Sequence, residues 1–182
     1  MRHFFTRSVP AFSRVLLIES GSRQLIENLL AVLYQNHAEM TCDLVTCYVG
    51  VPKNFREAQG TIYRVADYPA GDTRQRFYKK LSGNRYTVLG IVCSAEPIMT
   101  KWKWMLGARL PGKVFVLNEN GDYFWLDYGH LGAIRYFILF RAGLTGSGAV
   151  RTLARLVVFP FSLLYLILYA ITVHFRRSLR TQ

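Results

Sequence analysis

The side chains of this chain that suit chemistry lie directly after apolar runs. Glutamates at such positions can act as a general base that takes a proton from a substrate hydroxyl. Small and hydroxyl-bearing residues beside them, with a glycine that lets the backbone approach a ligand, suit a phosphate bound at a helix N-terminus. We predict catalytic roles for Glu19, Glu96 and Glu119. The predicted ligand-binding residues are Ser20, Gly21, Ser22, Arg23, Ser94 and Asn118.

Each of these residues also has a structural interpretation. Ser20 and Ser22 suit a helix cap, Glu96 suits a helix dipole, and Glu119 suits a hairpin turn. The chain lacks the glycine patterns GxGxxG and GxxxxGK[ST], so neither a dinucleotide site nor an ordinary P-loop is predicted. Its four histidines are scattered, and the pattern predicts neither a metal site nor a cofactor.

The elements that position these residues alternate between strands and helices. Apolar runs predict strands, and segments with helical periodicity between them predict helices at 23–34 and 72–81 and after Ser94, which is expected to cap the third helix. We therefore predict an α/β fold with a Rossmann-like, mostly parallel sheet and helices on both faces. Its ligand crevice should lie between the first and fourth strands. The predicted strands are 14–19, 43–50, 61–65, 86–93, 113–118 and a hairpin or edge strand at 122–127.

An uncharged run of eighteen residues at 156–173 makes about 27 Å of helix, close to the thickness of a bilayer core. The alternative is a buried core helix, but such helices are usually shorter and carry a polar stripe. Either the helix spans the bilayer once, or Pro160 bends it into a re-entrant segment that returns both basic flanks to one face. We favour the single span because proline near a helix start is tolerated.

Arginines surround this run, and no acidic residue follows Asp127. Guanidinium groups at that depth suit lipid phosphates. The predicted organisation is an arm at 1–12, the Rossmann-like domain at 13–128, an interfacial amphipathic helix and hinge at 129–148, and a membrane helix with basic flanks at 149–182. The predicted membrane or lipid-phosphate contacts are Arg135, Arg141, Arg151, Arg155, Arg176 and Arg177.

The net charge of +12 is thus concentrated near the predicted membrane helix, and no nucleic-acid-binding motif accompanies it. We therefore expect no nucleic-acid partner. The three cysteines contain no CxxC pair and indicate buried thiols in a reducing compartment. Arg7 and Arg14 interrupt the N-terminal apolar segment, which argues against a signal peptide. These features predict a domain on the cytoplasmic face of the inner (plasma) membrane.

Five segments carry a resemblance to a known family: RVLLIESGSRQLIENLLAVLY, DLVTCYVG, YTVLGIVCS, MTKWKWMLGARL and KVFVLNENGDYFWL. Together they resemble the N-terminal, acceptor-binding domain of GT-B glycosyltransferases, most nearly the heptosyltransferase family of lipopolysaccharide assembly. The resemblance covers roughly residues 13–127 and rests on the order of strands and helices. That family carries a Gly-Asp pair after the first strand, whereas here Ser22 follows Gly21 and only Glu19 is close. The family's donor-binding domain has no counterpart, and the membrane tail stands in its place.

The resemblance implies a membrane-anchored, glycosyltransferase-like subunit in envelope polysaccharide or lipid-linked glycan synthesis. Its partners would be a soluble glycosyltransferase subunit and a lipid-linked glycan or sugar nucleotide, as in the split N-acetylglucosaminyltransferase of dolichol-linked oligosaccharide synthesis. Two alternatives stay open. One is a non-catalytic membrane scaffold that recruits a cytoplasmic partner. The other is a small complete enzyme for a lipid phosphate, with Arg135, Arg141 and Arg151 as clamps.

Overall fold

The computed structural model describes residues 3–69, 71–94, 96–145 and 148–180. The chain divides into two compact units, one reaching to Ile134 and the other from Arg135 to the end. The first unit is built on a six-stranded sheet with helices on both faces, so the predicted α/β fold is confirmed. Its strands are β1 (Arg14–Glu19), β2 (Thr41–Thr46), β3 (Ile62–Arg64), β4 (Val88–Cys93), β5 (Lys113–Asn118) and β6 (Tyr123–Trp125).

The strands lie in the order β3-β2-β1-β4-β5-β6. The first five are parallel, and β6 pairs antiparallel with β5, which confirms the predicted hairpin. The chain moves from β1 outward to β3 and then returns to the other side of β1 with β4. The order therefore reverses between β1 and β4, as the prediction of a crevice at this point required.

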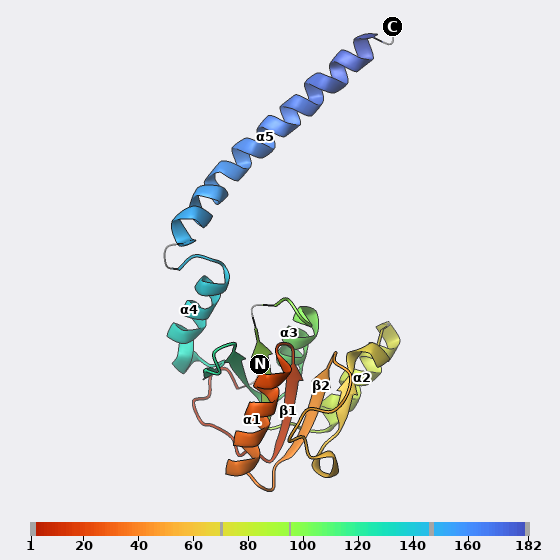
Figure 1. Ribbon diagram of the computed structural model, residues 1–182, viewed down its shortest axis with the longest axis vertical. Coiled ribbons are helices and arrows are strands. Elements are labelled where there is room, and N and C mark those ends of the chain that lie inside the picture. Colours follow the sequence, from red (N-terminus) through yellow and green to blue (C-terminus); the bar gives the residue numbers. More distant parts are fainter. Residues whose placement is uncertain (1–2, 70, 95, 146–147, 181–182) are drawn as a thin grey trace. The chain divides into compact units, whose positions relative to one another are not determined.

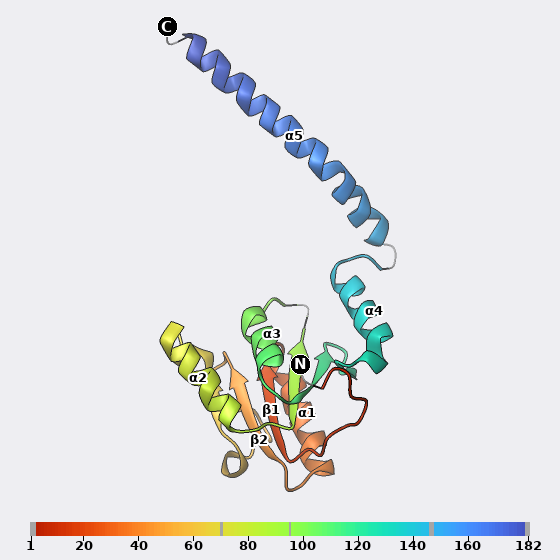
Figure 2. The same ribbon diagram turned by 180° about the vertical axis from the view of Figure 1, so that it is seen from behind.

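Three helices cover the sheet. Helix α1 (Arg23–Asn36) lies on one face, and α2 (Gly71–Gly83) and α3 (Thr100–Arg109) lie on the other (Figures 1 and 2). Apolar residues at helical spacing turn α1 toward the strands, so that Ile26, Leu30 and Leu33 are buried. Every residue of β4 is buried, as expected of a central parallel strand.

The start of the third helix differs from the prediction. Ser94 does not cap it, because α3 begins six residues later at Thr100. The residue at its cap position is Met99, whose backbone is left-handed with a φ of 50°. The second strand also starts and ends earlier than predicted, at 41–46 instead of 43–50. Both differences lie in connections, where periodicity carries no information about the exact boundary.

The arm before β1 packs into the first unit. Lys113 donates hydrogen bonds from Nζ to the carbonyls of Thr6 and Ser8, at 2.8 and 3.0 Å. The same ammonium forms a buried ion pair with Asp127, at 2.9 Å between Nζ and Oδ2. Because a buried charge needs a partner, these contacts tie the arm to β5. The predicted arm therefore packs against the sheet domain.

The second unit contains most of α4 (Leu131–Arg141) and all of α5 (Gly148–Arg180). None of the residues of α4 is buried. The helix ends at Arg141, and Gly143 follows as a left-handed cap, with a φ of 67° and an N–H bond to the carbonyl of Phe140. Residues 146–147 of the predicted hinge lie outside the described part of the chain.

Helix α5 is 33 residues long and continues through Pro160 without a break (Figure 1). Its segment Ala149–His174 is long and apolar enough to cross a membrane, and none of the most apolar stretch is buried. A core helix of a soluble domain would be covered by the rest of the chain, which this one is not. The uninterrupted helix favours the single-span alternative over the re-entrant one.

Candidate functional site

The loops after β1 and β4 meet at the point where the strand order reverses. Ser20 donates a hydrogen bond from Oγ to the carbonyl of Val92 in β4, so it joins the two strands instead of capping α1. A Cβ on Gly21 would lie 2.9 Å from both Ser94 Oγ and Val92 Cγ1. Any larger residue here would force Ser94 or Val92 to move. The structure therefore brings Ser20, Gly21 and Ser94 together, as the sequence predicted.

Glu19 ends β1 with a fully buried side chain. Arg23 reaches both of its carboxylate oxygens, with Nε 3.1 Å from Oε1 and Nη2 3.4 Å from Oε2. The guanidinium also donates to the carbonyl of Val49, at 2.8 Å. A carboxylate held in this way would have to break its ion pair to accept a substrate proton. Glu19 therefore acts here as the group that orients Arg23, and its catalytic role stays a prediction.

Tyr48 lies at the same edge and was not singled out from the sequence. It donates a hydrogen bond from its hydroxyl to the carbonyl of Gly21, at 3.0 Å, and its ring lies 5.5 Å from the guanidinium of Arg23. Burial raises the pKa of Tyr48, and the nearby charges of Cys47 and Glu96 raise it further. Its position just after β2, the neighbour of β1, is the signal that could have revealed it.

Ser94 is half-buried, and its hydroxyl is hidden from solvent. Among the described residues, Ser94 Oγ has no hydrogen-bond partner. Glu96, two residues later, is exposed and close enough to Tyr48 to affect its pKa. Ser22 occupies the cap position of α1 but makes no side-chain cap bond. The edge thus packs Gly21 against Ser94 and Val92, and the exposed carboxylate closest to them in the chain is that of Glu96.

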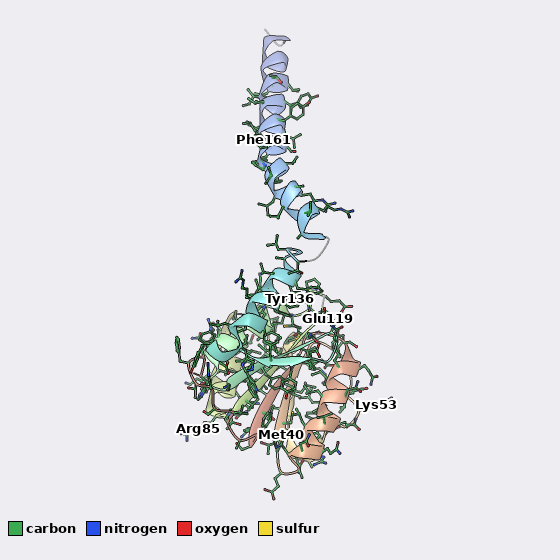
Figure 3. All side chains as sticks on the ribbon, turned by 90° about the vertical axis from the view of Figure 1, so that its left-hand side faces the viewer. Met40, Lys53, Arg85, Glu119, Tyr136 and Phe161 are labelled. Carbon is green, nitrogen blue, oxygen red and sulfur yellow. The ribbon has the colours of Figure 1, made fainter. Side chains whose placement is uncertain are left out.

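The residues after β5 have a different role. Asn118 Oδ1 accepts the backbone N–H groups of Asn120 and Asp122, at 3.0 and 2.9 Å, and so closes the hairpin to β6. Glu119 borders a hollow of about 260 Å³ beside α1, with Leu25 and Asn28 opposite. Figure 3 shows Glu119 at the end of the domain opposite Met40, which precedes β2. Asn118 and Glu119 both lie at the carboxyl edge of the sheet, but the side chain of Asn118 is engaged in the turn.

An apolar trough runs between α1 and the part of the sheet formed by β5 and β6. It consists of the hollow beside Glu119 and an adjoining one of about 280 Å³, which share Leu29 and Val32 of α1. Phe115 and Trp125 form part of its floor, where no second helix covers this end of the sheet in the described first unit. Val32 is 53% exposed. The trough is an apolar surface without a partner in the first unit.

The predicted lipid-contacting arginines lie in the second unit. Arg135, Arg151 and Arg155 are exposed, and the guanidinium of Arg141 lies 5.3 Å from the ring of Phe137. The side chains of Arg176 and Arg177 lie outside the described part of the chain, although both residues belong to α5.

Within residues 3–69, 71–94, 96–145 and 148–180, no group of three or more His, Cys, Asp or Glu side chains is arranged to hold a metal ion. No protein-family model, curated protein or solved structure matches this chain. The resemblance to the GT-B glycosyltransferases therefore stays a prediction.

Proposed function

We propose that the chain is a membrane-anchored, glycosyltransferase-like subunit that acts in envelope polysaccharide or lipid-linked glycan synthesis and depends on a separate donor-binding partner. The observation that supports this proposal best is the reversal of strand order between β1 and β4. Ligands of open parallel sheets bind outside the carboxyl ends of the strands at such a point. The order from β3 to β5 is also compatible with a Rossmann-like sheet, the fold that this proposal assigns to an acceptor-binding domain.

In this proposal the crevice binds the acceptor. The free N–H groups at the start of α1 attract an acceptor phosphate, because a helix N-terminus carries a partial positive charge. Ser94 Oγ has no partner among the described residues and is hidden from solvent, so it donates to the acceptor only when binding exposes it. Glu96 is the carboxylate best placed to act as the base toward a sugar hydroxyl, since it is exposed at this edge whereas Glu19 is paired with Arg23.

The second unit would hold this domain at the cytoplasmic face of the inner membrane. Helix α5 is apolar over a length that spans a bilayer, and Arg151 and Arg155 occupy its first turns. Arginine side chains at that depth bind lipid phosphates. In this proposal the anchor keeps the first unit at the membrane that carries a lipid-linked acceptor.

The test is to purify the full chain from native membranes in a mild detergent and to assay the eluate for transfer from sugar nucleotides to endogenous lipid-linked acceptors. We expect the wild-type eluate to transfer sugar. Glu96→Gln should reduce transfer at least about 100-fold, as removal of a general base does, while Glu57→Gln, at an exposed position in another loop, should leave it unchanged. Equal transfer by Glu96→Gln and wild type would contradict the assigned base.

The second candidate function is a scaffold that recruits a cytoplasmic partner. The exposed apolar trough beside α1 and the ion-paired state of Glu19 favour it. In that case Val32→Glu should abolish recovery of the co-purifying partner, whereas the triple replacement of Glu19, Glu96 and Glu119 by glutamine should retain it. Loss of transfer in a folded triple variant that still binds its partner would instead argue against a pure scaffold.

A further inference from the structure

Helix α5 carries a line of hydroxyl side chains along one face. Positions that alternate between three and four residues apart fall on the same side of a helix. Ser162, Tyr165, Tyr169 and Thr172 have this spacing, and we call these four residues the hydroxyl stripe. Val158 and Arg155 continue the same line toward the start of the helix. On the opposite side lie Leu156, Ile167 and Ile171, which are purely aliphatic.

The tyrosines of the hydroxyl stripe lie deeper in the apolar run than is usual for tyrosine in a membrane helix. Tyrosine is enriched where the bilayer meets water, because its hydroxyl stays wet there. Tyr165 instead lies at the middle of the apolar run 156–173, and Tyr169 is one turn away, about 6 Å along the axis. Both side chains are exposed, at 67% and 59%. In a spanning helix, these phenol groups would sit in hydrocarbon.

The four hydroxyls differ in what they bind within the helix. Ser162 donates to the carbonyl of Val158 at 3.2 Å, and Thr172 donates to that of Tyr169 at 2.7 Å. No hydrogen bond joins the phenol groups of Tyr165 and Tyr169 to the described part of the chain. Their rings stack at 6.4 Å with an interplanar angle of 21°, so the two side chains stand together along the same side of the helix. Figure 3 shows the side chains of α5, Phe161 among them, standing out from the helix.

A polar group left without a hydrogen bond in hydrocarbon is unfavourable by several kcal/mol in order of magnitude. Lipid headgroups cannot reach the middle of the bilayer, so the partner must be another spanning segment. A second copy of α5 meets this need, since a phenol both donates and accepts and the same residues arrive at the same depth when both copies insert in one direction. The spacing of three and four also suits helices that cross at about 20°.

We propose that two copies of this chain associate in the membrane through the hydroxyl stripe, as a parallel pair of α5 helices with Tyr165 and Tyr169 hydrogen-bonded across the interface. This inference rests on the membrane-spanning part of the proposed function and is independent of the glycosyltransferase part. Arg155 lies outside the apolar run, where anionic lipid phosphates neutralise its charge in both copies. The aliphatic side of each helix then faces lipid.

Cysteine crosslinking of the full chain tests the interface. The background is Cys47→Ser, because Cys42 and Cys93 are buried. Single cysteines are introduced by Ser162→Cys on the stripe or Val158→Cys in line with it, and by Ile167→Cys on the opposite side, as far from the middle of the run 156–173 as Ser162. Each protein is reconstituted into vesicles of phosphatidylcholine and phosphatidylglycerol, tested for resistance to alkaline carbonate extraction, and oxidised with copper phenanthroline.

Ser162→Cys and Val158→Cys should give disulfide-linked dimers, and Ile167→Cys should give about ten-fold less, because a disulfide forms only between closely spaced Cβ atoms. Equal crosslinking on both sides, or none in protein that resists extraction, would overturn the pairing while leaving the membrane anchor in place. Extraction of the protein by carbonate would overturn the anchor and this inference together.

A second measurement isolates the hydroxyl groups. The double variant Tyr165→Phe, Tyr169→Phe keeps both rings and removes only the two phenol oxygens. Energy transfer between labelled copies, followed as lipid dilutes the protein, should show dimerisation weakened by about ten-fold. Ile167→Ala, on the lipid-facing side, serves as the matched control and should change the affinity little. Unchanged dimerisation in the double variant would show that the phenol groups do not hold the pair together.

Discussion

At the scale of single residues, the most consequential contact outside the candidate site is the buried pair of Lys113 and Asp127. Both side chains are 1% exposed, and the carboxylate also accepts a hydrogen bond from His130 Nδ1 at 2.8 Å. Burial alone raises the pKa of Asp127, but the hydrogen bonds and positive charges of His130 and Lys113 outweigh it, and the pKa is lowered. The pair joins β5, the turn before α4 and the N-terminal arm.

Asp127→Asn should therefore lower the free energy of unfolding by about 3 kcal/mol or more, because it leaves the Lys113 ammonium buried without a counter-charge. Urea unfolding of the full chain in detergent, followed by tryptophan fluorescence, measures this loss, since the ring of Trp125 lies 5.3 Å from Lys113 Nζ. Asp67→Asn, at an exposed position, is the control and should change stability by less than about 0.5 kcal/mol.

The same pair predicts a dependence on pH. A carboxylate whose pKa is lowered by folding stabilises the fold fully when the pH is above its pKa in the unfolded chain. This stabilisation is lost as the pH falls through its pKa in the folded protein. The ordinary pKa is 3.8, so the difference in stability between wild type and Asp127→Asn should be fully present at about pH 5 and shrink as the pH falls below 3.8. A difference that stayed constant through this acid range would exclude the charged pair as its source.

The three cysteines should differ in reactivity. Cys42 and Cys93 are buried and Cys47 is exposed, and burial raises the pKa of the Cys42 thiol to about 12, with the charge of Asp43 adding to it. Because the thiolate is the reactive form, maleimide at about pH 8 should label one thiol in the native chain and three in denaturant. Mass spectrometry counts the adducts. Rapid native labelling of Cys42 would contradict the packing of β2.

At the scale of elements, the approach of β3 to β2 depends on a glycine. A Cβ on Gly60 would lie 1.7 Å from the carbonyl oxygen of Cys42. Next to it, Thr61 donates its N–H to Asp43 Oδ1 at 2.8 Å and accepts the N–H of Leu44 at 2.9 Å. The edge strand therefore pairs with β2 only while residue 60 has no side chain.

Gly60→Ala should displace β3 and reduce the free energy of unfolding by about 3 kcal/mol or more, since a backbone atom blocks the new methyl group. Gly71→Ala is the matched control, because a Cβ on Gly71 meets nothing within 4 Å. Thermal unfolding of both variants in the same detergent compares them directly. Equal stability of the two proteins would show that the loop before β3 can shift without loss.

At the scale of the whole molecule, the character of the chain changes between its two units. The first has an apolar core on the α1 side of the sheet, whereas the second exposes apolar side chains along α4 and α5. Large exposed apolar surfaces mark binding to membranes or to other proteins. The second unit is therefore expected to decide where the protein resides, and the first to decide what it binds.

Two charges in the middle of α5 should release the protein from membranes. Leu164→Arg and Leu168→Arg together oppose insertion by about 5 to 7 kcal/mol, at 2.5 to 3.5 kcal/mol for each arginine near the helix centre. The variant should be extracted by alkaline carbonate, and wild type should stay in the pellet. Leu153→Arg, near the helix start, is the control and should stay in the membrane as well. Retention of the double variant would contradict a spanning helix.

Much of the organisation could be predicted from local sequence. Alternation of apolar runs and helical segments predicted the sheet, the hairpin after Asn118 and the long C-terminal helix, because each depends on residues close together in the chain. The helix predicted at 72–81 is present as α2, and its buried residues Phe77, Tyr78 and Leu81 have helical spacing. These features reflect backbone geometry and burial, which neighbouring residues determine.

Only the tertiary structure decided which side chains meet across long separations. Three examples are hydrogen-bonded contacts between residues more than 25 positions apart. They are those of Ser20 with Val92, of Tyr48 with Gly21, and of Lys113 with the arm. Glu19 and Arg23 are close in sequence, but their ion pair forms only because the end of β1 and the start of α1 direct the two side chains toward each other. Local sequence does not determine these directions. Sequence alone determined the elements of this protein, and the three-dimensional packing determined which polar groups they leave accessible for chemistry.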